Sequence, residues 1–168
     1  MGKEAISSAE IEAIVYAYPA EMRYSLAIMQ DLQKHYNYIP REAFDIIAAH
    51  TKSSAARLYA IATFYKALSL KPKGRHIIKV CDGTACHIQG SVNLIDGIKR
   101  ELGISPGETT SDGEFSLETV NCLGACAIAP VLVVGKTYYG KTTPEKLPRI
   151  LDKYRNGSAG AGDKEAEI

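Results

Sequence analysis

Cys81-Asp-Gly-Thr-Ala-Cys86 and Asn121-Cys-Leu-Gly-Ala-Cys126 together hold all 4 cysteines of this 168-residue chain. Both segments are rich in glycine and other small residues. A loop with two thiolates can bind one side of an inorganic centre, and a second loop beside it completes a four-sulfur ligand set. The candidate metal and cofactor ligands are therefore Cys81, Cys86, Cys122 and Cys126.

The spacing of the cysteines favours one [2Fe-2S] cluster over one zinc ion. Thiolate ligands suit both centres, so ligand type alone does not separate them. Zinc ribbons and fingers often use Cys-x2-Cys, whereas this chain has Cys81-x4-Cys86 and Cys122-x3-Cys126. Plant-type ferredoxins need a third cysteine soon after the first pair, and none is present. A structural zinc-binding interaction module remains the alternative of another class.

Other cysteine chemistries match the sequence less well. Disulfides suit secreted proteins, but the start Met1-Gly-Lys-Glu-Ala lacks the features of a signal peptide, so we expect a cytoplasmic location. A thioredoxin-type dithiol needs Cys-x-x-Cys, and haem attachment needs Cys-x-x-Cys-His. Rieske ligation needs two histidines, and only His87 lies near the cysteines. Thiol oxidoreductase chemistry and disulfides stay open as minor alternatives.

Composition limits the possible partners. Lys and Arg number 20 against 19 Asp and Glu, so no bulk field recruits nucleic acid or an anionic membrane. The longest apolar runs, such as 126–134, fall well short of the roughly 18 residues of a membrane-spanning helix. A hydrophobic content of 46% is ordinary for a globular protein. We expect a soluble protein without direct membrane insertion or nucleic-acid binding.

Residues 1–73 are expected to form an N-terminal helical bundle. Apolar residues recur at helical spacing in four segments: one after a capping box at Ser7, one over 20–36, one from Pro40, and one capped by Ser53 or Ser54. Such a short bundle has a thin core of its own. We therefore expect one of its faces to be buried against the second domain or a partner.

Residues 74–155 are expected to form an α/β domain in the order β-α-β-β-β-α. A short strand from His76 ends at the first cysteine loop, 83–90, and an amphipathic helix over 91–102 ends at Gly103. Phe115 to Val120 alternates as a strand before the second loop. A further strand over 131–134, a hairpin return and a helix from Pro144 follow, and residues 156–168 are expected to be a disordered tail.

Several motifs, in order from about residue 10 to 154, resemble the NuoE family, the thioredoxin-like [2Fe-2S] subunits of NADH-dehydrogenase modules. They are Ala62-Thr-Phe-Tyr65, Cys81-Asp-Gly-Thr-Ala-Cys86-His87, Gly107-Glu-Thr-Thr110, Asp112-Gly113, and Asn121-Cys-Leu-Gly-Ala-Cys126 followed by Ala129-Pro130. The resemblance implies an α+β fold: an N-terminal helical bundle followed by a thioredoxin-like α/β [2Fe-2S] ferredoxin domain. It also implies that Cys81, Cys86, Cys122 and Cys126 are the cluster ligands.

The resemblance further implies one-electron transfer beside an FMN/NADH-binding flavoprotein subunit. The first loop is more similar to that of family members from soluble NAD(P)H-dependent oxidoreductases of the electron-bifurcating hydrogenase type than to that of respiratory members. Such an assembly implies a second partner, an iron-sulfur catalytic subunit such as a hydrogenase-like chain. The same role in respiratory complex I is the alternative. No Gly-x-Gly-x-x-Gly motif is present, so FMN and NAD(P)H are expected on the partner. We expect no catalytic residue and no independent substrate site on this chain.

Overall fold

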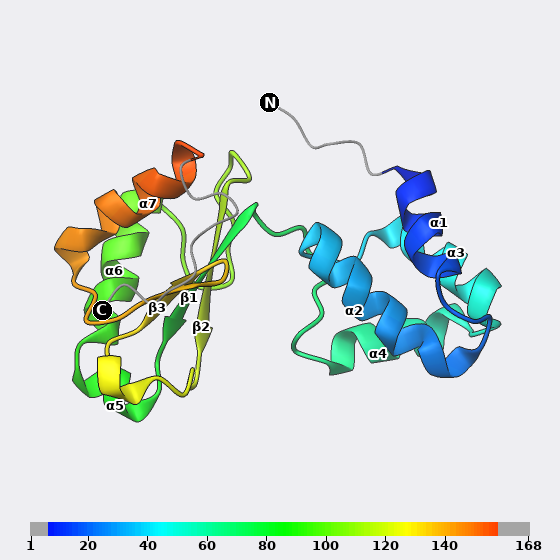
Figure 1. The fold of residues 1–168 in the computed structure, drawn as a ribbon, viewed down its shortest axis with the longest axis horizontal. Helices are drawn as coiled ribbons and strands as arrows, with labels where there is room; N and C mark the ends of the chain where they lie inside the picture. Colours follow the sequence, from blue (N-terminus) through cyan, green and yellow to red (C-terminus); the bar gives the residue numbers. More distant parts are fainter. Residues whose placement is uncertain (1–6, 158–168) are drawn as a thin grey trace. The chain divides into compact units, whose positions relative to one another are not determined.

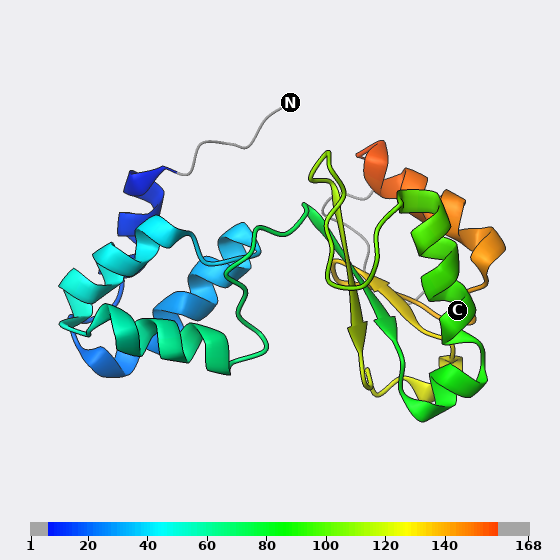
Figure 2. The ribbon, with the colours of Figure 1, turned by 180° about the vertical axis from the view of Figure 1, so that it is seen from behind.

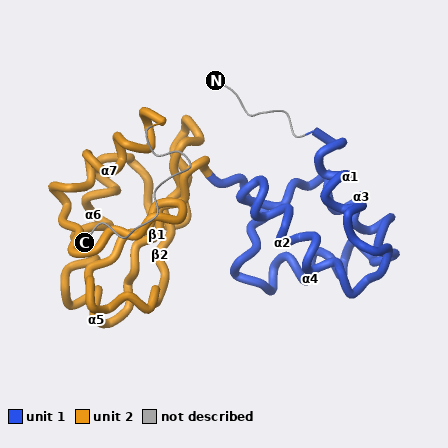
Figure 3. The backbone as a smooth tube through the Cα atoms, viewed as in Figure 1, with its two compact units in different colours: residues 1–73 blue, residues 74–168 orange. Residues whose placement is uncertain are grey.

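The computed structural model describes residues 7–157, and the chain divides into two compact units, Met1–Lys73 and Gly74–Ile168 (Figure 3). The tail expected over 156–168 lies outside the described residues from 158 onward. Within 7–157, no helix is both long and apolar enough to cross a membrane.

The first unit is built from helices (Figure 1). They are α1 (Ser8–Tyr16), the 3-10 turn η1 (Met22–Tyr24), α2 (Ser25–Tyr36), α3 (Arg41–Thr51) and α4 (Ala55–Phe64). The apolar stripes of these helices meet in one core, as their spacing predicts. Its buried residues are Ile11, Val15, Ile28, Met29, Leu32, Ile39, Ala43, Phe44, Ile47, Leu58, Ala62 and Leu68.

At the starts of the helices, one cap and one first residue differ from the expectation, and one cap agrees with it. The capping box is not formed, because the Ser7 side chain makes no cap hydrogen bond and its backbone oxygen accepts the first helical amides instead. The second helix begins at Ser25 rather than near residue 20, after η1, and Ser25 Oγ donates to Met22 O at 2.8 Å. Ser54 caps α4 as expected, with its Oγ accepting from Arg57 N at 3.3 Å.

The second unit is a four-stranded sheet with helices packed on it (Figures 1 and 2). Its elements are β1 (His76–Cys81), α5 (Thr84–Ile88), α6 (Ser91–Leu102), β2 (Phe115–Val120), η2 (Cys126–Ile128), β3 (Leu132–Val134), β4 (Thr137–Tyr139), η3 (Pro144–Lys146) and α7 (Leu147–Arg155). The strand order is β2-β1-β3-β4. The helices α6 and α7 lie side by side in both views, which gives the α+β architecture that was expected.

The core of this unit lies between the sheet and the pair α6 and α7. It comprises Ile78, Val80, Leu94, Ile98, Ile104, Phe115, Leu117, Leu132, Val134, Tyr139, Leu147, Ile150, Leu151 and Tyr154. A smaller cluster joins the first two cysteines, Cys81 and Cys86, to Val131 and Val133. The first cysteine loop is thus anchored on buried side chains at and just before β3.

The boundaries near the cysteines differ in detail from the sequence expectation. The strand from His76 runs through Cys81, and the third strand begins at Leu132 rather than Val131. Residues 84–88 of the expected first loop form α5. The last helix opens with the 3-10 turn η3 at Pro144 before α7 begins, and such turns are frequent at helix N-termini.

Candidate metal centre

The topology of the sheet brings the two cysteine loops to one edge. β1 and β2 are parallel, with Cys81 in register with Val120, so their carboxyl ends lie at the same edge of the sheet. Cys81 is the last residue of β1, and Cys122 follows the end of β2 by two residues. Loops that follow parallel strands at this edge are a common place for ligand sites.

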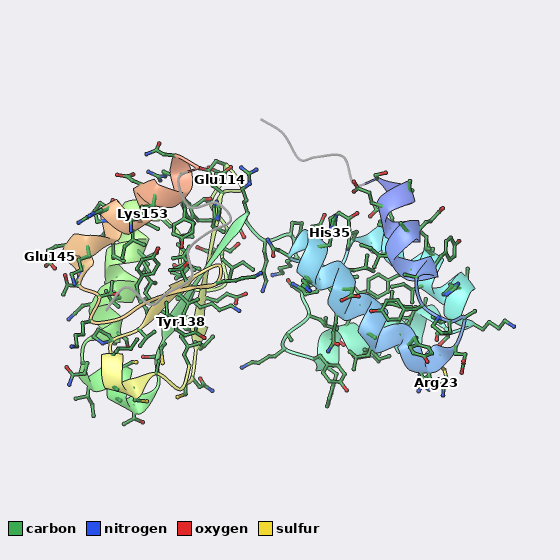
Figure 4. The ribbon with its side chains drawn as sticks, viewed as in Figure 1. Arg23, His35, Glu114, Tyr138, Glu145 and Lys153 are labelled. Atoms are coloured by element: carbon green, nitrogen blue, oxygen red, sulfur yellow. The ribbon has the colours of Figure 1, made fainter. Side chains whose placement is uncertain are left out.

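All four predicted ligands border one open pocket of about 540 Å³. Figure 4 shows the side chains of the protein, with sulfur atoms in yellow. Asp82, Gly83, Thr84, Ala85 and Asn121 complete its lining. Cys81 and Cys86 are 2% and 1% exposed, whereas Cys122 and Cys126 are exposed to solvent. No disulfide joins these four cysteines. The pocket therefore has a buried side formed by the first loop and an open side formed by the second.

The thiols are grouped as two pairs. Within each pair, one thiol shifts the pKa of the other: after burial, the Cys81 thiol is the main cause that raises the pKa of Cys86, and the Cys122 thiol is the main cause that raises the pKa of Cys126. Among residues 7–157, no three Cys, His, Asp or Glu side chains are gathered closely enough to hold a single metal ion. Because a [2Fe-2S] cluster takes two thiolates on each of two irons, paired thiols suit it better than they suit one tetrahedral zinc.

Burial and mutual repulsion disfavour the thiolate forms of the cysteines in the pocket, and a bound cationic centre would stabilise them. Burial raises the pKa of the Cys86 thiol to about 11, with the neighbouring Cys81 thiol adding to the shift and a backbone hydrogen bond from Val131 opposing it. The charge of Cys122 is the main cause that raises the pKa of Cys126. Thiolates so close together repel one another, and a bound metal reverses that balance by stabilising the deprotonated form. The donor set thus fits an iron-sulfur group.

Backbone amides approach the sulfur atoms. Gly124 N donates to Cys122 Sγ at 3.3 Å, and this turn needs glycine because Gly124 has φ +76. At Cys86, the Val131 backbone opposes the rise in the pKa of the thiol. Such N–H donors to ligand sulfur are among the features that tune an iron-sulfur cluster.

Asp82 organises the first loop, a role that sequence reasoning did not assign to it. Its Oδ1 accepts from Ser91 Oγ at 3.0 Å and lies 2.9 Å from His87 Nδ1. The His87 hydrogen bond is the main cause that lowers the pKa of Asp82. His87 therefore makes a hydrogen bond within the loop, and Asp82 connects α5 to the start of α6. In the sequence, only the position of Asp82 directly after Cys81 could have indicated this role.

The family model of the thioredoxin-like [2Fe-2S] ferredoxin matches residues 11–155. Among curated relatives, the chain is 39% identical over 148 residues to a protein of Rickettsia bellii named as a subunit of NADH-quinone oxidoreductase, covering 86% of this chain and 89% of the relative. It is 33% identical over 145 residues to the HndA subunit of the NADP-reducing hydrogenase of Solidesulfovibrio fructosivorans, covering 86% and 85%. These relatives match across both units.

A solved structure shows the same fold. The chain matches a NAD+-reducing [NiFe]-hydrogenase in the H2-reduced state with a TM-score of 0.68 and 18% sequence identity. The match covers 82% of this chain and only 23% of the hydrogenase chain, so it shows similarity of fold alone. The family match over residues 11–155 establishes that the chain belongs to the thioredoxin-like [2Fe-2S] ferredoxin family.

Proposed function

We propose that this chain is a one-electron-transfer subunit whose [2Fe-2S] cluster is held by Cys81, Cys86, Cys122 and Cys126. The observation that carries the proposal is the gathering of these four thiols, from two separate loops, around one pocket as two pairs. Two pairs of thiolates are the protein ligand set of a [2Fe-2S] cluster. When bound, the cluster supplies the capacity to accept and release a single electron.

The two loops have different tasks in this proposal. The buried thiols of Cys81 and Cys86 anchor the cluster against the apolar residues Val131 and Val133 and keep water from that side. The exposed thiols of Cys122 and Cys126 leave the other side open to a redox partner. The Gly124 amide stabilises negative charge on Cys122 Sγ. No side chain needs to act as a catalytic acid or base for this task.

The proposed setting is a soluble, cytoplasmic, multi-subunit NAD(P)H-dependent oxidoreductase of the electron-bifurcating hydrogenase type. An FMN/NADH-binding flavoprotein subunit would hold FMN and NAD(P)H, since this chain carries no Gly-x-Gly-x-x-Gly motif, and residues 135–142, which have the spacing of a P-loop, lie in the hairpin of β3 and β4 instead of before a helix. A hydrogenase-like iron-sulfur chain would be the further partner. The similarity to a protein named for an NADP-reducing hydrogenase supports this setting.

A second candidate is the same electron-transfer role in the NADH module of respiratory complex I. The relative from Rickettsia bellii, at 39% identity, is named for NADH-quinone oxidoreductase and favours it. Both settings place the same chemistry on this chain and differ in the chains that surround it.

Anaerobic purification of the native assembly separates these candidates. Iron, acid-labile sulfide and zinc are assayed, the electron-paramagnetic resonance spectrum of the reduced sample is recorded, and co-purifying chains are identified by mass spectrometry. A flavoprotein with a hydrogenase-like chain supports the soluble setting, and membrane-arm chains support complex I. Zinc without iron would overturn the electron-transfer proposal in favour of a structural zinc module.

A further inference from the structure

The helix α4 is apolar on all sides, yet only one side is buried. Its ten residues, Ala55–Phe64, include a single charged residue, Arg57, and its buried members are Leu58 and Ala62. The opposite side, called the α4 face, consists of Ala56, Tyr59, Ala60, Thr63 and Phe64, all exposed. A helix that is apolar all round is normally covered all round. The composition of α4 therefore indicates that another surface covers the α4 face.

The large side chains at this face are unusually accessible. Phe64 is 80% exposed and Tyr59 is 56% exposed, and Tyr65, which caps the helix, is 41% exposed. Thr63 adds little polarity, because its Oγ1 donates back to the carbonyl oxygens of Tyr59 and Ala60. Exposed aromatic residues beside small ones are typical of surfaces that another protein covers.

The charged residues on α4 and next to it in the sequence have one sign. Between residues 46 and 81 the sequence contains no Asp or Glu and seven Lys or Arg residues, although the whole chain is nearly neutral. Arg57 lies on the helix, and Lys52 and Lys66 flank its two ends, all exposed. A surface with an apolar centre and a cationic border is complementary to one with an apolar centre and an acidic border.

We propose that the α4 face is a docking site for an apolar surface bordered by Asp and Glu on a partner subunit. This docking site rests on the proposed function in one respect: the partner is a subunit of the proposed oxidoreductase assembly. A second copy of this chain is a poorer occupant, because a two-fold contact would bring Arg57 and Lys66 against their own copies. A lipid surface is also poorer, since Phe64 and Tyr59 are the only large apolar side chains of the face.

Site-specific crosslinking in the native assembly tests the identity of the occupant. A photo-reactive phenylalanine derivative replaces Phe64 in the full chain, and the crosslinked peptides are identified after illumination. We expect a crosslink to a partner subunit, within a segment that carries several Asp or Glu residues. Crosslinks to a second copy, to residues 74–155 of the same chain, to lipid, or to no chain would each overturn the proposal.

Substitutions test the contributions of the apolar centre and the charged border. Phe64→Ser and the double variant Arg57→Glu with Lys66→Glu should each lower the affinity for the assembly roughly tenfold or more. Tyr16→Ser is the matched control, because Tyr16 is 59% exposed on α1 and should leave assembly unchanged. Normal assembly of both test variants would contradict the docking site.

The readouts keep this proposal separate from the proposed function. Helix content by circular dichroism confirms that each variant folds, and the visible spectrum of each isolated full chain reports the cluster. Loss of assembly with an intact cluster spectrum supports the docking site. Absence of a cluster in the parent chain as well would count against the proposed electron-transfer function, while the crosslinking result would still decide the docking site.

Discussion

Gly83 in the first cysteine loop lies directly against the backbone carbonyl of Asn121 in the second. A Cβ atom at Gly83 would stand 2.3 Å from Asn121 O, which is shorter than any real contact of that kind. The obstacle is backbone rather than the end of a flexible side chain, so it cannot rotate away. The close approach of the two loops therefore depends on the absence of a side chain at this position.

Gly83→Ala should lower cluster content, because the added methyl group forces the two loops apart. We expect iron and acid-labile sulfide per chain to fall well below the parent values while helix content stays the same. Gly97→Ala is the control: its Cβ would meet mainly the Leu147 Cδ1 methyl group, away from the cysteines, so cluster content should persist. Full cluster content in Gly83→Ala would show that the loops can separate without losing their ligand geometry.

Cys122→Ala should abolish normal cluster assembly, since it removes one proposed ligand of the exposed pair. The measurement is iron and sulfide content together with the visible spectrum after anaerobic purification. Leu123→Ala, a neighbouring change that spares all four sulfurs, should retain the cluster. Unchanged cluster content in Cys122→Ala would remove this residue from the ligand set.

Asp82→Asn should raise the midpoint potential of the cluster, because it removes a negative charge next to the proposed ligand Cys81. The expected rise is roughly tens of millivolts for a partly solvated charge. Redox titration followed by electron-paramagnetic resonance measures it. Asp152→Asn, on α7 and outside the pocket lining, should leave the potential unchanged. A potential that does not move in Asp82→Asn would limit the role of Asp82 to holding His87 and Ser91.

The sequence predicted best those elements whose signals are local. The helix Ser91–Leu102 was placed correctly because its apolar residues recur at helical spacing and Gly103, at φ +67, ends it. Phe115–Val120 was placed correctly because it alternates and follows a turn at Asp112-Gly113.

Elements set by tertiary contacts were less predictable. The helix α5 has only five residues, too few to show a period, and it is stabilised by the bond between His87 and Asp82 and by the burial of Cys86. The four cysteines could be proposed as ligands from their spacing. Their meeting at one edge depends on the parallel pairing of β1 with β2, and no local pattern encodes that register.

His76 should make the second unit less stable in acid. Burial is the main cause that lowers the pKa of His76, and its ring packs against Phe115 and Tyr154 with centroids 5.7 and 5.1 Å apart. Because the folded pKa is the lower one, the unfolded chain binds the proton first as the pH falls below about 6.5. Stability is complete above that pH and declines as the pH falls through the folded pKa.

Urea unfolding between pH 7.5 and 5 measures this effect for the parent and for His76→Phe, which keeps a ring at the same place. We expect the free energy of unfolding of the parent to fall over this range by more than that of the variant. Equal slopes for the two proteins would show that His76 titrates alike in the folded and unfolded states.

Leu32→Ala should destabilise the first unit without changing the cluster. Leu32 is fully buried in a core made only of residues from the first unit, while the cysteines contact a separate cluster in the second. Truncation of a buried leucine costs about 2–5 kcal/mol through lost contacts and the cavity left behind. Calorimetry of the full chain should show a lower transition for the first unit, with the visible spectrum of the cluster unchanged. If the cluster spectrum bleached together with that early transition, the two cores would be folding as one cooperative body, and the cluster domain would depend on the bundle for its own stability.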